Sequence, residues 1–343
     1  MTIELGLFDI HQVDPTDPDP TDRVFERRLH LLALADEVGL SYAFTAERHF
    51  LQTYRAPAPT AWIAAASQRT SKIRLGVLAY TLPMHLPAAL AEEVAVLDHL
   101  TRGRLEVGFG LGHRPEELEG IGIDPSEREQ LFQERYAVMT ALWEGATVGL
   151  DRPGTVIRNI AIHPPPLQQP YPPLWFAGSD PHGAYWAGTR GMSLAIGFKR
   201  TVDLMPSVTA FRAARDAKPS NLAGAGRIAL MRQVAIAASD QAAIDAMAED
   251  LDRLHRMGTG SQSDAEQARA FAHRLIAEET FVAGSPDTVA NAILKAQEQL
   301  GISVFLANIH ASGVSDDRLG EMTRLLATEV APRLRAAGDG GLA

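Results

Sequence analysis

The sequence predicts an α/β protein built as a single (β/α)8 TIM barrel, with insertions after strands 4 and 7. Residues 73–80 form an apolar, β-branched run, and apolar side chains then recur at helical spacing from Pro87 onward. A second apolar run follows at 104–110, which completes a parallel strand–helix–strand unit. Such a sheet must be covered on both faces or closed into a barrel. Eight strands alternate with helices and no linker marks a second domain, so the barrel fits best and a doubly wound sheet is the alternative.

The predicted strands are apolar runs bounded by Gly, Pro or polar residues. In chain order they lie at residues 3–8, 42–46, 73–80, 104–110, 174–177, 193–197, 228–238 and 303–309. The helices between them show periodic apolar faces, with a polar or proline residue at many starts and glycine after several ends. They lie at residues 22–38, 60–69, 87 to about 102, 127–143, 181–189, 201–216, 240–256, 286–300 and 316–336.

Three segments do not belong to the regular alternation. We expect a polar connector at 114–131, a hairpin strand at 156–162, and a polar, partly mobile insertion at 257–280. The barrel domain is predicted to span residues 1–337 and to be followed by a disordered tail at 338–343.

Composition narrows the class of function. The net charge is −10 and no run of Lys or Arg occurs, which argues against a nucleic-acid partner. The chain has no cysteine, so it has neither a disulfide nor a thiol nucleophile. No apolar run approaches the roughly 20 residues that span a bilayer, and no signal peptide is visible. We therefore expect a soluble cytoplasmic protein that acts on a small molecule.

Histidines gather at the predicted rim of the barrel, where the C-terminal ends of the strands build the active site in this fold. Five of eleven follow predicted strands: His11, His49, His85, His113 and His310. Neutral imidazole is the commonest metal ligand, so a metal-dependent barrel hydrolase is an alternative function. The paired His-x-His ligands of such enzymes are absent, and we predict no metal-binding residues.

The strand at 42–46 leads into Glu47-Arg48-His49. Because side chains alternate along a strand, Glu47 and His49 should share one side. His49 could then act as an acid or base with Glu47 orienting it. A Glu47–Arg48 ion pair beside a structural histidine fits the same residues equally well.

Two further motifs follow strands. Gly108-Phe109-Gly110-Leu111-Gly112 resembles a dinucleotide loop, but His113 stands where the third required glycine would be, so we do not predict NAD. These glycines let the backbone approach a flat ligand or pack tightly. Gly178-Ser179-Asp180-Pro181 begins a helix, whose free N–H groups suit phosphate. Asp180 would repel phosphate unless it caps its own helix, and an ordinary capped helix fits this motif as well.

Taken in order, the motifs resemble the bacterial luciferase-like family of flavin-dependent monooxygenases. The resemblance covers nearly the whole chain and is carried by residues 46–50, 69–76, 82–83, 91–93, 97–112, 178–179, 187, 191, 282–286 and 330–332. It implies a homodimeric barrel that binds reduced FMN without a covalent link. The flavin would react with O2 to a C4a-peroxyflavin that oxygenates a small organic substrate. A separate flavin reductase would supply the reduced FMN.

The resemblance also assigns residues. It implies a non-proline cis peptide bond at Leu78–Ala79, with the flavin ring near Ala79, Tyr80, Gly110, Leu111 and Gly197. The phosphate would lie at Gly178 and the backbone of Ser179 and Asp180, met by Arg128, while Arg114 and Arg200 are other candidates. The catalytic group would comprise His49, Glu47 and Arg48.

Two departures from the pattern matter. Light-emitting members carry a catalytic histidine where this chain has Arg48, and a phosphate-binding arginine where it has Leu111, so we do not expect luminescence. One branch of the family uses the deazaflavin F420 for hydride transfer and usually carries Asp-His after strand two. Glu47-Arg48-His49-Phe50 favours FMN, with an F420-dependent oxidoreductase as the alternative. A non-catalytic flavin-binding protein is a further alternative on this fold.

Overall fold

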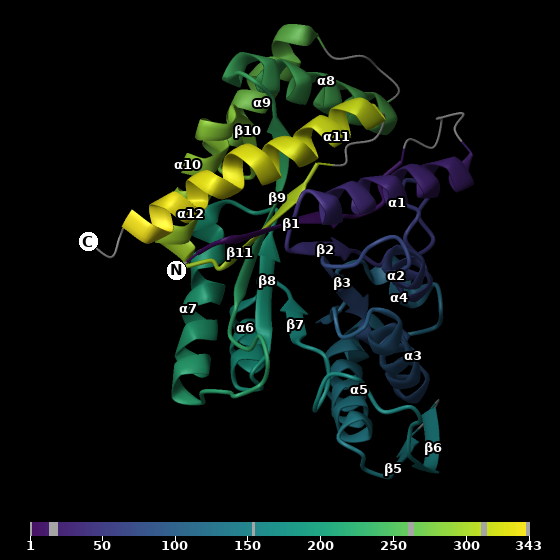
Figure 1. Cartoon of the computed structure of the whole chain (residues 1–343). Helices are drawn as coiled ribbons and strands as arrows, with labels where there is room; N and C mark the ends of the chain where they lie inside the picture. The colour runs from purple at the N-terminus through teal and green to yellow at the C-terminus, as the bar shows by residue number, and fades with distance from the viewer. Residues whose placement is uncertain (1, 14–19, 153–154, 260–263, 310–313, 341–343) are drawn as a thin grey trace.

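The computed structural model describes residues 2–13, 20–152, 155–259, 264–309 and 314–340. Eight parallel strands form a closed barrel, because β9 pairs with β8 on one side and with β11 on the other (Figure 1). The predicted barrel is confirmed, and the open doubly wound sheet is wrong. The barrel strands in spatial order are β1 (Glu4–Asp9), β2 (Tyr42–Thr45), β3 (Arg74–Thr81), β4 (Leu105–Gly110), β7 (Leu174–Ala177), β8 (Ser193–Gly197), β9 (Ile228–Ile236) and β11 (Val304–Asn308).

Helices cover the outside of this ring. Those that connect or follow the barrel strands are α1 (Thr21–Glu37), α2 (Pro59–Ser67), α3 (Pro87–Leu100), α5 (Arg128–Trp143), α6 (Pro181–Gly188), α7 (Thr201–Ala217), α8 (Asp240–Thr259), α10 (Pro286–Leu300) and α11 (Asp316–Leu325). The last helix continues through the π-helical segment η3 (Leu326–Val330) into α12 (Ala331–Gly340). Residues 338–340 of the expected disordered tail thus belong to this helix, and residues 341–343 lie outside the described part.

The insertion after β4 is confirmed, but it is more regular than a polar connector. It contains α4 (Pro115–Glu119) and the 3-10 turn η2 (Pro125–Glu127) before α5. The expected hairpin strand is β6 (Thr155–Ile160), and its antiparallel partner β5 (Val148–Arg152) was not predicted. A further 3-10 turn, η1 (Leu82–Met84), follows β3.

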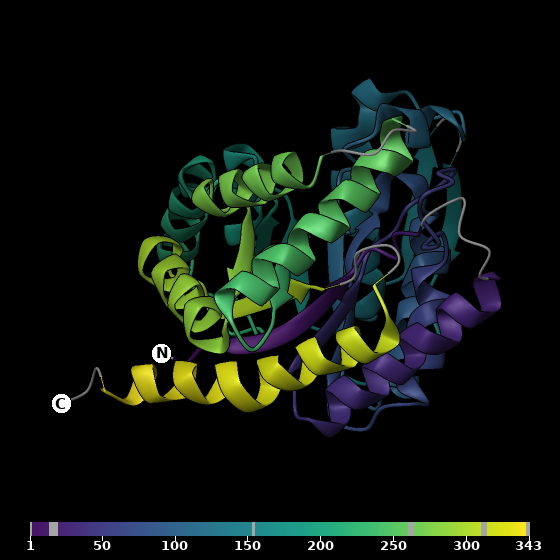
Figure 2. The same cartoon turned by 90° about the horizontal axis from the view of Figure 1, so that it is seen from above.

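The insertion after β9 corrects the expectation of a partly mobile segment. Residues 265–277 of it form helix α9 (Ala265–Ala277), and the short strand β10 (Phe281–Gly284) pairs with the end of β9. Ala268 and Ala272 lie one turn apart and are buried against α8. These two small residues form the apolar stripe of the helix, and the charged residues around them make that stripe difficult to recognise in the sequence. In Figure 1, α8 and α9 lie at the top, and Figure 2 shows α8 running across the barrel strands.

A buried carboxylate ties the barrel together. Glu106 on β4 is fully buried and accepts hydrogen bonds from Trp175 Nε1 at 2.6 Å and Arg227 Nη2 at 2.7 Å. Arg74 on β3 donates to the same carboxylate from the other side at 2.5 Å. Removing one partner of such a buried group typically costs about 3–5 kcal/mol.

The packed core has two layers. Large apolar side chains fill the barrel interior, among them Phe8, Phe44, Leu78 and Trp175. A larger cluster fills the space between strands and surrounding helices. Among the described residues, no helix is both long and apolar enough to cross a bilayer.

Candidate functional site

The end of β3 is irregular where the flavin ring was expected. The Leu78–Ala79 peptide bond is cis, which confirms the non-proline cis bond at this position. The pairing of β3 with β4 shifts register between Val77 and Tyr80. Leu78 packs into the barrel interior, and Ala79 stays partly exposed. The Tyr80 ring instead packs in the outer core with its hydroxyl 3.2 Å from Thr60 Oγ1, so its side chain does not face the mouth.

The glycines on β4 differ in what surrounds them. A Cβ at Gly108 would lie 2.4 Å from the Val77 carbonyl oxygen, so this position is closed to any side chain. A Cβ at Gly110 would meet nothing closer than the Ala79 Cβ at 3.4 Å. The interpretation as tight packing is therefore confirmed at Gly108, whereas Gly110 is buried but has room for a methyl group. Leu111, which follows, is partly buried against the outer core.

Gly197, at the end of β8, is required by its neighbour. A Cβ there would lie 2.6 Å from the Met231 carbonyl oxygen on β9. Ala177 and Gly178 at the end of β7 are only partly buried, and the Ala177 carbonyl oxygen is 3.6 Å from the Cβ position of Gly110. The structure therefore brings Ala79, Gly110 and the end of β7 together at adjacent strand ends.

A buried carboxylate lies beside this group of small residues. Glu47 accepts a hydrogen bond from the Thr81 amide, and its Oε1 accepts one from His85 Nε2 at 2.8 Å. His49 Nε2 lies 3.3 Å from the same oxygen, but the ring is not aligned for a hydrogen bond. Burial raises the pKa of Glu47, but these histidines and the Thr81 amide outweigh it and lower the pKa to about 2.

His85 is the residue that sequence reasoning left out of the catalytic group. It follows η1 and reaches Glu47 across 38 positions of the chain. The signal in the sequence was its place after the third strand, yet nothing there showed that it shares a carboxylate with His49. The Glu47 carboxylate raises the pKa of His49, against the opposing effect of partial burial. The group therefore holds a fixed negative charge and a histidine that keeps its proton to higher pH.

The Arg48 side chain extends away from Glu47 and His49. Its guanidinium donates to the Glu47 carbonyl oxygen at 3.2 Å and not to the carboxylate, so the expected Glu47–Arg48 ion pair does not form. Its charged neighbours are Glu117 and Arg114, and burial lowers its pKa. Glu117 is buried on α4, and its Oε1 has no hydrogen-bond partner among the described residues. Partial burial, Arg48 and Arg114 all lower the pKa of His113.

Asp180 caps its own helix. Its carboxylate accepts the Gly183 amide hydrogen at 2.8 Å, and Pro181 occupies the first position of α6. The adjacent Ser179 carbonyl oxygen accepts a hydrogen bond from Ser207 Oγ at 2.6 Å. This settles the capping role that the sequence left open, and the capped carboxylate points at its own backbone.

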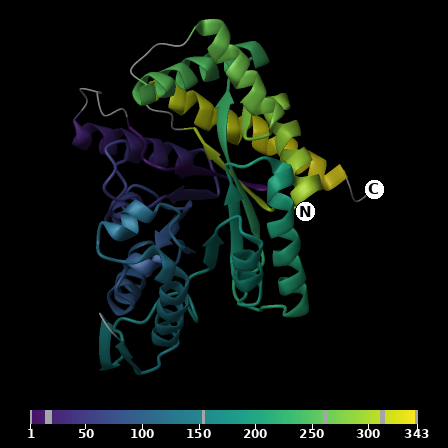
Figure 3. The same cartoon turned by 180° about the vertical axis from the view of Figure 1, so that it is seen from behind.

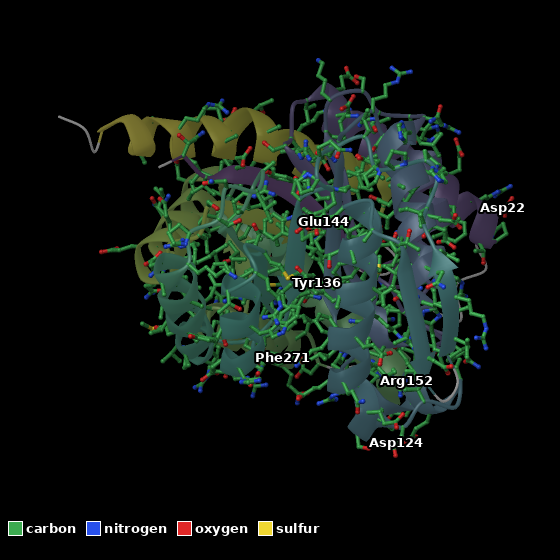
Figure 4. The ribbon with its side chains drawn as sticks, turned by 90° about the horizontal axis from the view of Figure 1, so that it is seen from below. Asp22, Asp124, Tyr136, Glu144, Arg152 and Phe271 are labelled. Atoms are coloured by element: carbon green, nitrogen blue, oxygen red, sulfur yellow. The ribbon has the colours of Figure 1, made fainter. Side chains whose placement is uncertain are left out.

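Helix α5 packs against the strand that leads to this cap. Phe132 contacts the Phe176 ring, with centroids 5.8 Å apart, and the Trp186 ring at 5.2 Å. Figure 4 shows Tyr136, one turn further along α5, between Asp124 and Glu144 and nearer to Glu144. Arg128 begins the helix one turn before Phe132 and is partly buried. Residues one turn apart share a helix face, so Arg128 lies on the side that packs toward β7 and α6.

One further predicted rim histidine, His11, does not join this group. His11 is buried, with its ring 4.4 Å from the Trp62 ring and its Nε2 3.7 Å from Asp9. His310 lies outside the described residues. Within the described ranges, no three His, Cys, Asp or Glu side chains are placed to hold a metal ion.

Comparison with known proteins identifies the family. Residues 3–303 match the family described as "Luciferase-like monooxygenase". The chain belongs to the luciferase-like monooxygenase family. It is 28% identical over 198 residues to the oxygenase component of a flavin-dependent trigonelline monooxygenase from Acinetobacter baylyi, covering 57% of this chain and 54% of that one. A 4-hydroxyprotoasukamycin monooxygenase from Streptomyces nodosus is 27% identical over 98% of this chain and 94% of the relative.

Coverage of the curated members of the luciferase-like family is uneven. An uncharacterised protein, y4wF of Sinorhizobium fredii, is 33% identical, with 56% of each chain aligned. The chain thus spans about half the length of this relative and of the Acinetobacter protein.

Solved structures of low sequence identity share the luciferase-like fold. Monooxygenase RslO1 from Streptomyces bottropensis superposes with a TM-score of 0.82 at 24% identity, covering 96% of this chain and 99% of that one. The oxygenating constituent of 3,6-diketocamphane monooxygenase from Pseudomonas putida, in complex with FMN, gives 0.78 at 20% identity, with 97% and 98% covered. An F420-dependent secondary alcohol dehydrogenase gives 0.72 at 19% identity, with 98% and 100% covered. The fold is therefore common to FMN-binding and F420-binding proteins.

Proposed function

We propose that this chain is a monooxygenase that uses reduced FMN and O2 to oxygenate a small organic substrate. Family membership supports the reaction class, and one structural observation supports the cofactor. Near the ends of three neighbouring strands lie Ala79 on β3, Gly110 on β4 and Ala177–Gly178 at β7, which carry no side chain beyond a methyl group. Small residues at adjacent strand ends leave backbone open to a flat ring.

The residues present fit the isoalloxazine group. Bound reduced flavin supplies the electrons that activate O2. Ala79 and Gly110 would face the ring, with Leu111 and Gly197 beside it. Leu78 packs into the barrel below, and Tyr80 would contribute only backbone, because its side chain lies in the outer core.

The phosphate would lie at the start of α6. The backbone at Gly178, Ser179 and Asp180 would approach it, where the free N–H groups and the helix dipole favour an anion. The Asp180 carboxylate accepts the Gly183 amide hydrogen, which offsets part of its negative charge. Arg128 would add a cation, because its helix packs against β7 and α6 through Phe132.

The chain's own proton chemistry centres on His49. Glu47 is ionised over the whole physiological range, since its pKa is about 2. Its charge keeps His49 protonated at pH values where an unperturbed histidine is neutral. We assign His49 as proton donor to the reacting oxygen and Glu47 as the residue that positions it. Arg48 has Glu117 as a charged neighbour, and these two residues would determine the charge that the outer mouth of the barrel presents to the substrate.

The partners follow from the same proposal. The Acinetobacter relative is an oxygenase component, so we propose that a separate flavin reductase delivers reduced FMN to this chain. We also propose a homodimer, in line with the family resemblance of the sequence.

A binding experiment tests the cofactor. Purified protein is titrated with FMN, with FMN kept reduced under anaerobic conditions, and with F420, while flavin fluorescence and absorbance are followed. The proposal expects the tightest binding for reduced FMN and oxygen consumption only when reduced FMN is supplied. Preferential binding of F420 with hydride transfer would favour the F420-dependent alternative. Stoichiometric zinc or iron without flavin affinity would favour the hydrolase.

A further inference from the structure

A cavity lies outside the barrel, between its wall and the surrounding helices. It has a volume of about 150 Å3 and is bounded by β9, β10, β11, the end of α9, α10 and the first residue of α7. Figures 1 and 3 show α9, β10 and α10 grouped on one side of the barrel. Met231 lies inside the barrel, and strand alternation turns the next residue, Arg232, outward into this cavity.

Arg232 is almost entirely buried, at 2% exposure. Its guanidinium donates to the Met231 carbonyl oxygen at 3.2 Å and to Thr201 Oγ1 at 3.4 Å, both long contacts. Across the described residues, no carboxylate comes within 4.0 Å of it. Burial lowers its pKa to about 10, so it remains charged at neutral pH. A guanidinium carries five N–H donors, and burying it without an anionic partner costs free energy. A bound anion would neutralise its charge and accept its hydrogen bonds.

The carboxylate that lines this cavity already has partners. Glu279 binds Lys295, whose Nζ lies 2.5 Å from Oε1, and it also accepts a hydrogen bond from Thr201. The side chains of Lys295 and Glu279 are 59% and 32% exposed, so this ion pair lies at the mouth of the cavity. The ion pair is neutral as a unit, and Arg232 therefore leaves the cavity with one net positive charge.

The rest of the lining is mostly apolar, with Thr288 and Gln299 as its other polar residues. Leu230, Ile276, Phe281, Ala292 and Phe305 supply most of the wall. A cavity of about 150 Å3 in another protein holds benzene. The space therefore suits a ring-sized apolar body with one anionic group directed at the guanidinium.

We propose that this cavity binds a small organic monocarboxylate, with its carboxylate on Arg232 and its apolar part against β10, β11 and α10. Arginine holds a carboxylate through paired, charge-assisted hydrogen bonds, which the two long contacts of Arg232 leave available. The site is separate from the proposed flavin site, and it stands whether or not the chain binds FMN.

Calorimetric titration of the purified full-length protein tests this proposal, with benzoate as the probe and benzamide as its neutral counterpart. Benzoate should bind one site at least about tenfold more tightly than benzamide, because only the charged group gains the charge-assisted bonds. The interaction should persist with FMN present. Absence of benzoate binding in the millimolar range, or displacement of benzoate by FMN, would overturn the proposal.

Two variants locate the binding. Arg232→Met keeps the length of the side chain and should weaken benzoate binding at least about tenfold, while Arg335→Met, an exposed arginine away from the cavity, should leave it unchanged. Ala296→Leu fills the space from α10 and should abolish binding of both probes without removing any charge. Ala296→Leu keeps the test decisive if Arg232→Met does not fold. Wild-type affinity in both cavity variants would place benzoate elsewhere.

Discussion

Replacing Glu47 by glutamine removes the charge that His49 and His85 share and keeps the shape of the side chain. The pKa of Glu47 falls from 4.5 to about 2 on folding. A difference of this size corresponds to about 3 kcal/mol of folding free energy, at about 1.4 kcal/mol for each tenfold change in proton affinity. Because the folded-state pKa is depressed, this contribution is present above pH 4.5 and is lost as the pH falls toward 2.

The assay is urea unfolding of the wild type and Glu47→Gln at neutral pH and near pH 3. At neutral pH the variant should be less stable by about 3 kcal/mol, and the gap should shrink by about 2 kcal/mol near pH 3, where the wild-type carboxylate loses its advantage. Glu129→Gln, at an exposed position on α5, is the matched control and should change stability little. A gap that stays constant between the two pH values would refute the reasoning, since packing alone would then explain it.

Four further variants test the proposed site and the packing of the strand beside it. His49→Ala should slow oxygenation at least about a hundredfold while changing the Kd for reduced FMN by less than about threefold, and unchanged turnover would remove His49 from the mechanism. Arg128→Ala should weaken FMN binding about tenfold and leave riboflavin binding as it is; an equal loss for both ligands would point to misfolding and not to a phosphate contact. Gly108→Ala should destabilise the fold by about 1–3 kcal/mol, measured by thermal unfolding, because the new methyl group meets backbone at 2.4 Å. Gly110→Ala should fold normally and lose flavin affinity, so normal FMN binding in it would argue against the proposed ring position.

The fold was predictable because its strands are simple. Parallel barrel strands are buried on both faces, so each reads as an apolar run between turn residues. Helix α9 was missed because its buried stripe consists of alanines, which do not stand out among charges. Strands β5 and β10 were missed because a short strand is defined mainly by its pairing partner, which is β6 for β5 and the end of β9 for β10.

The candidate site was predictable in part. The cis bond at Leu78–Ala79 came from the family resemblance, and the structure has it. His85 was missed as a partner of Glu47 because adjacency around a barrel joins residues far apart in sequence. The burial of two other residues could not be predicted from the sequence. His11 follows a strand and was expected at the rim, but its ring packs on Trp62. Arg232 lies in an apolar strand, and nothing in the sequence indicated a cavity beside it.

Glu106 accepts hydrogen bonds from residues in both halves of the barrel. Arg74 belongs to the first four barrel strands, as Glu106 itself does, whereas Trp175 lies on β7 and Arg227 immediately precedes β9, both in the second half of the barrel. A gene cut between β4 and β7 would therefore yield one fragment with a half-neutralised acid and another with an arginine lacking its counter-ion. Each fragment would carry a chemical reason to recombine with the other, which makes this barrel suited to reassembly from two separately produced halves.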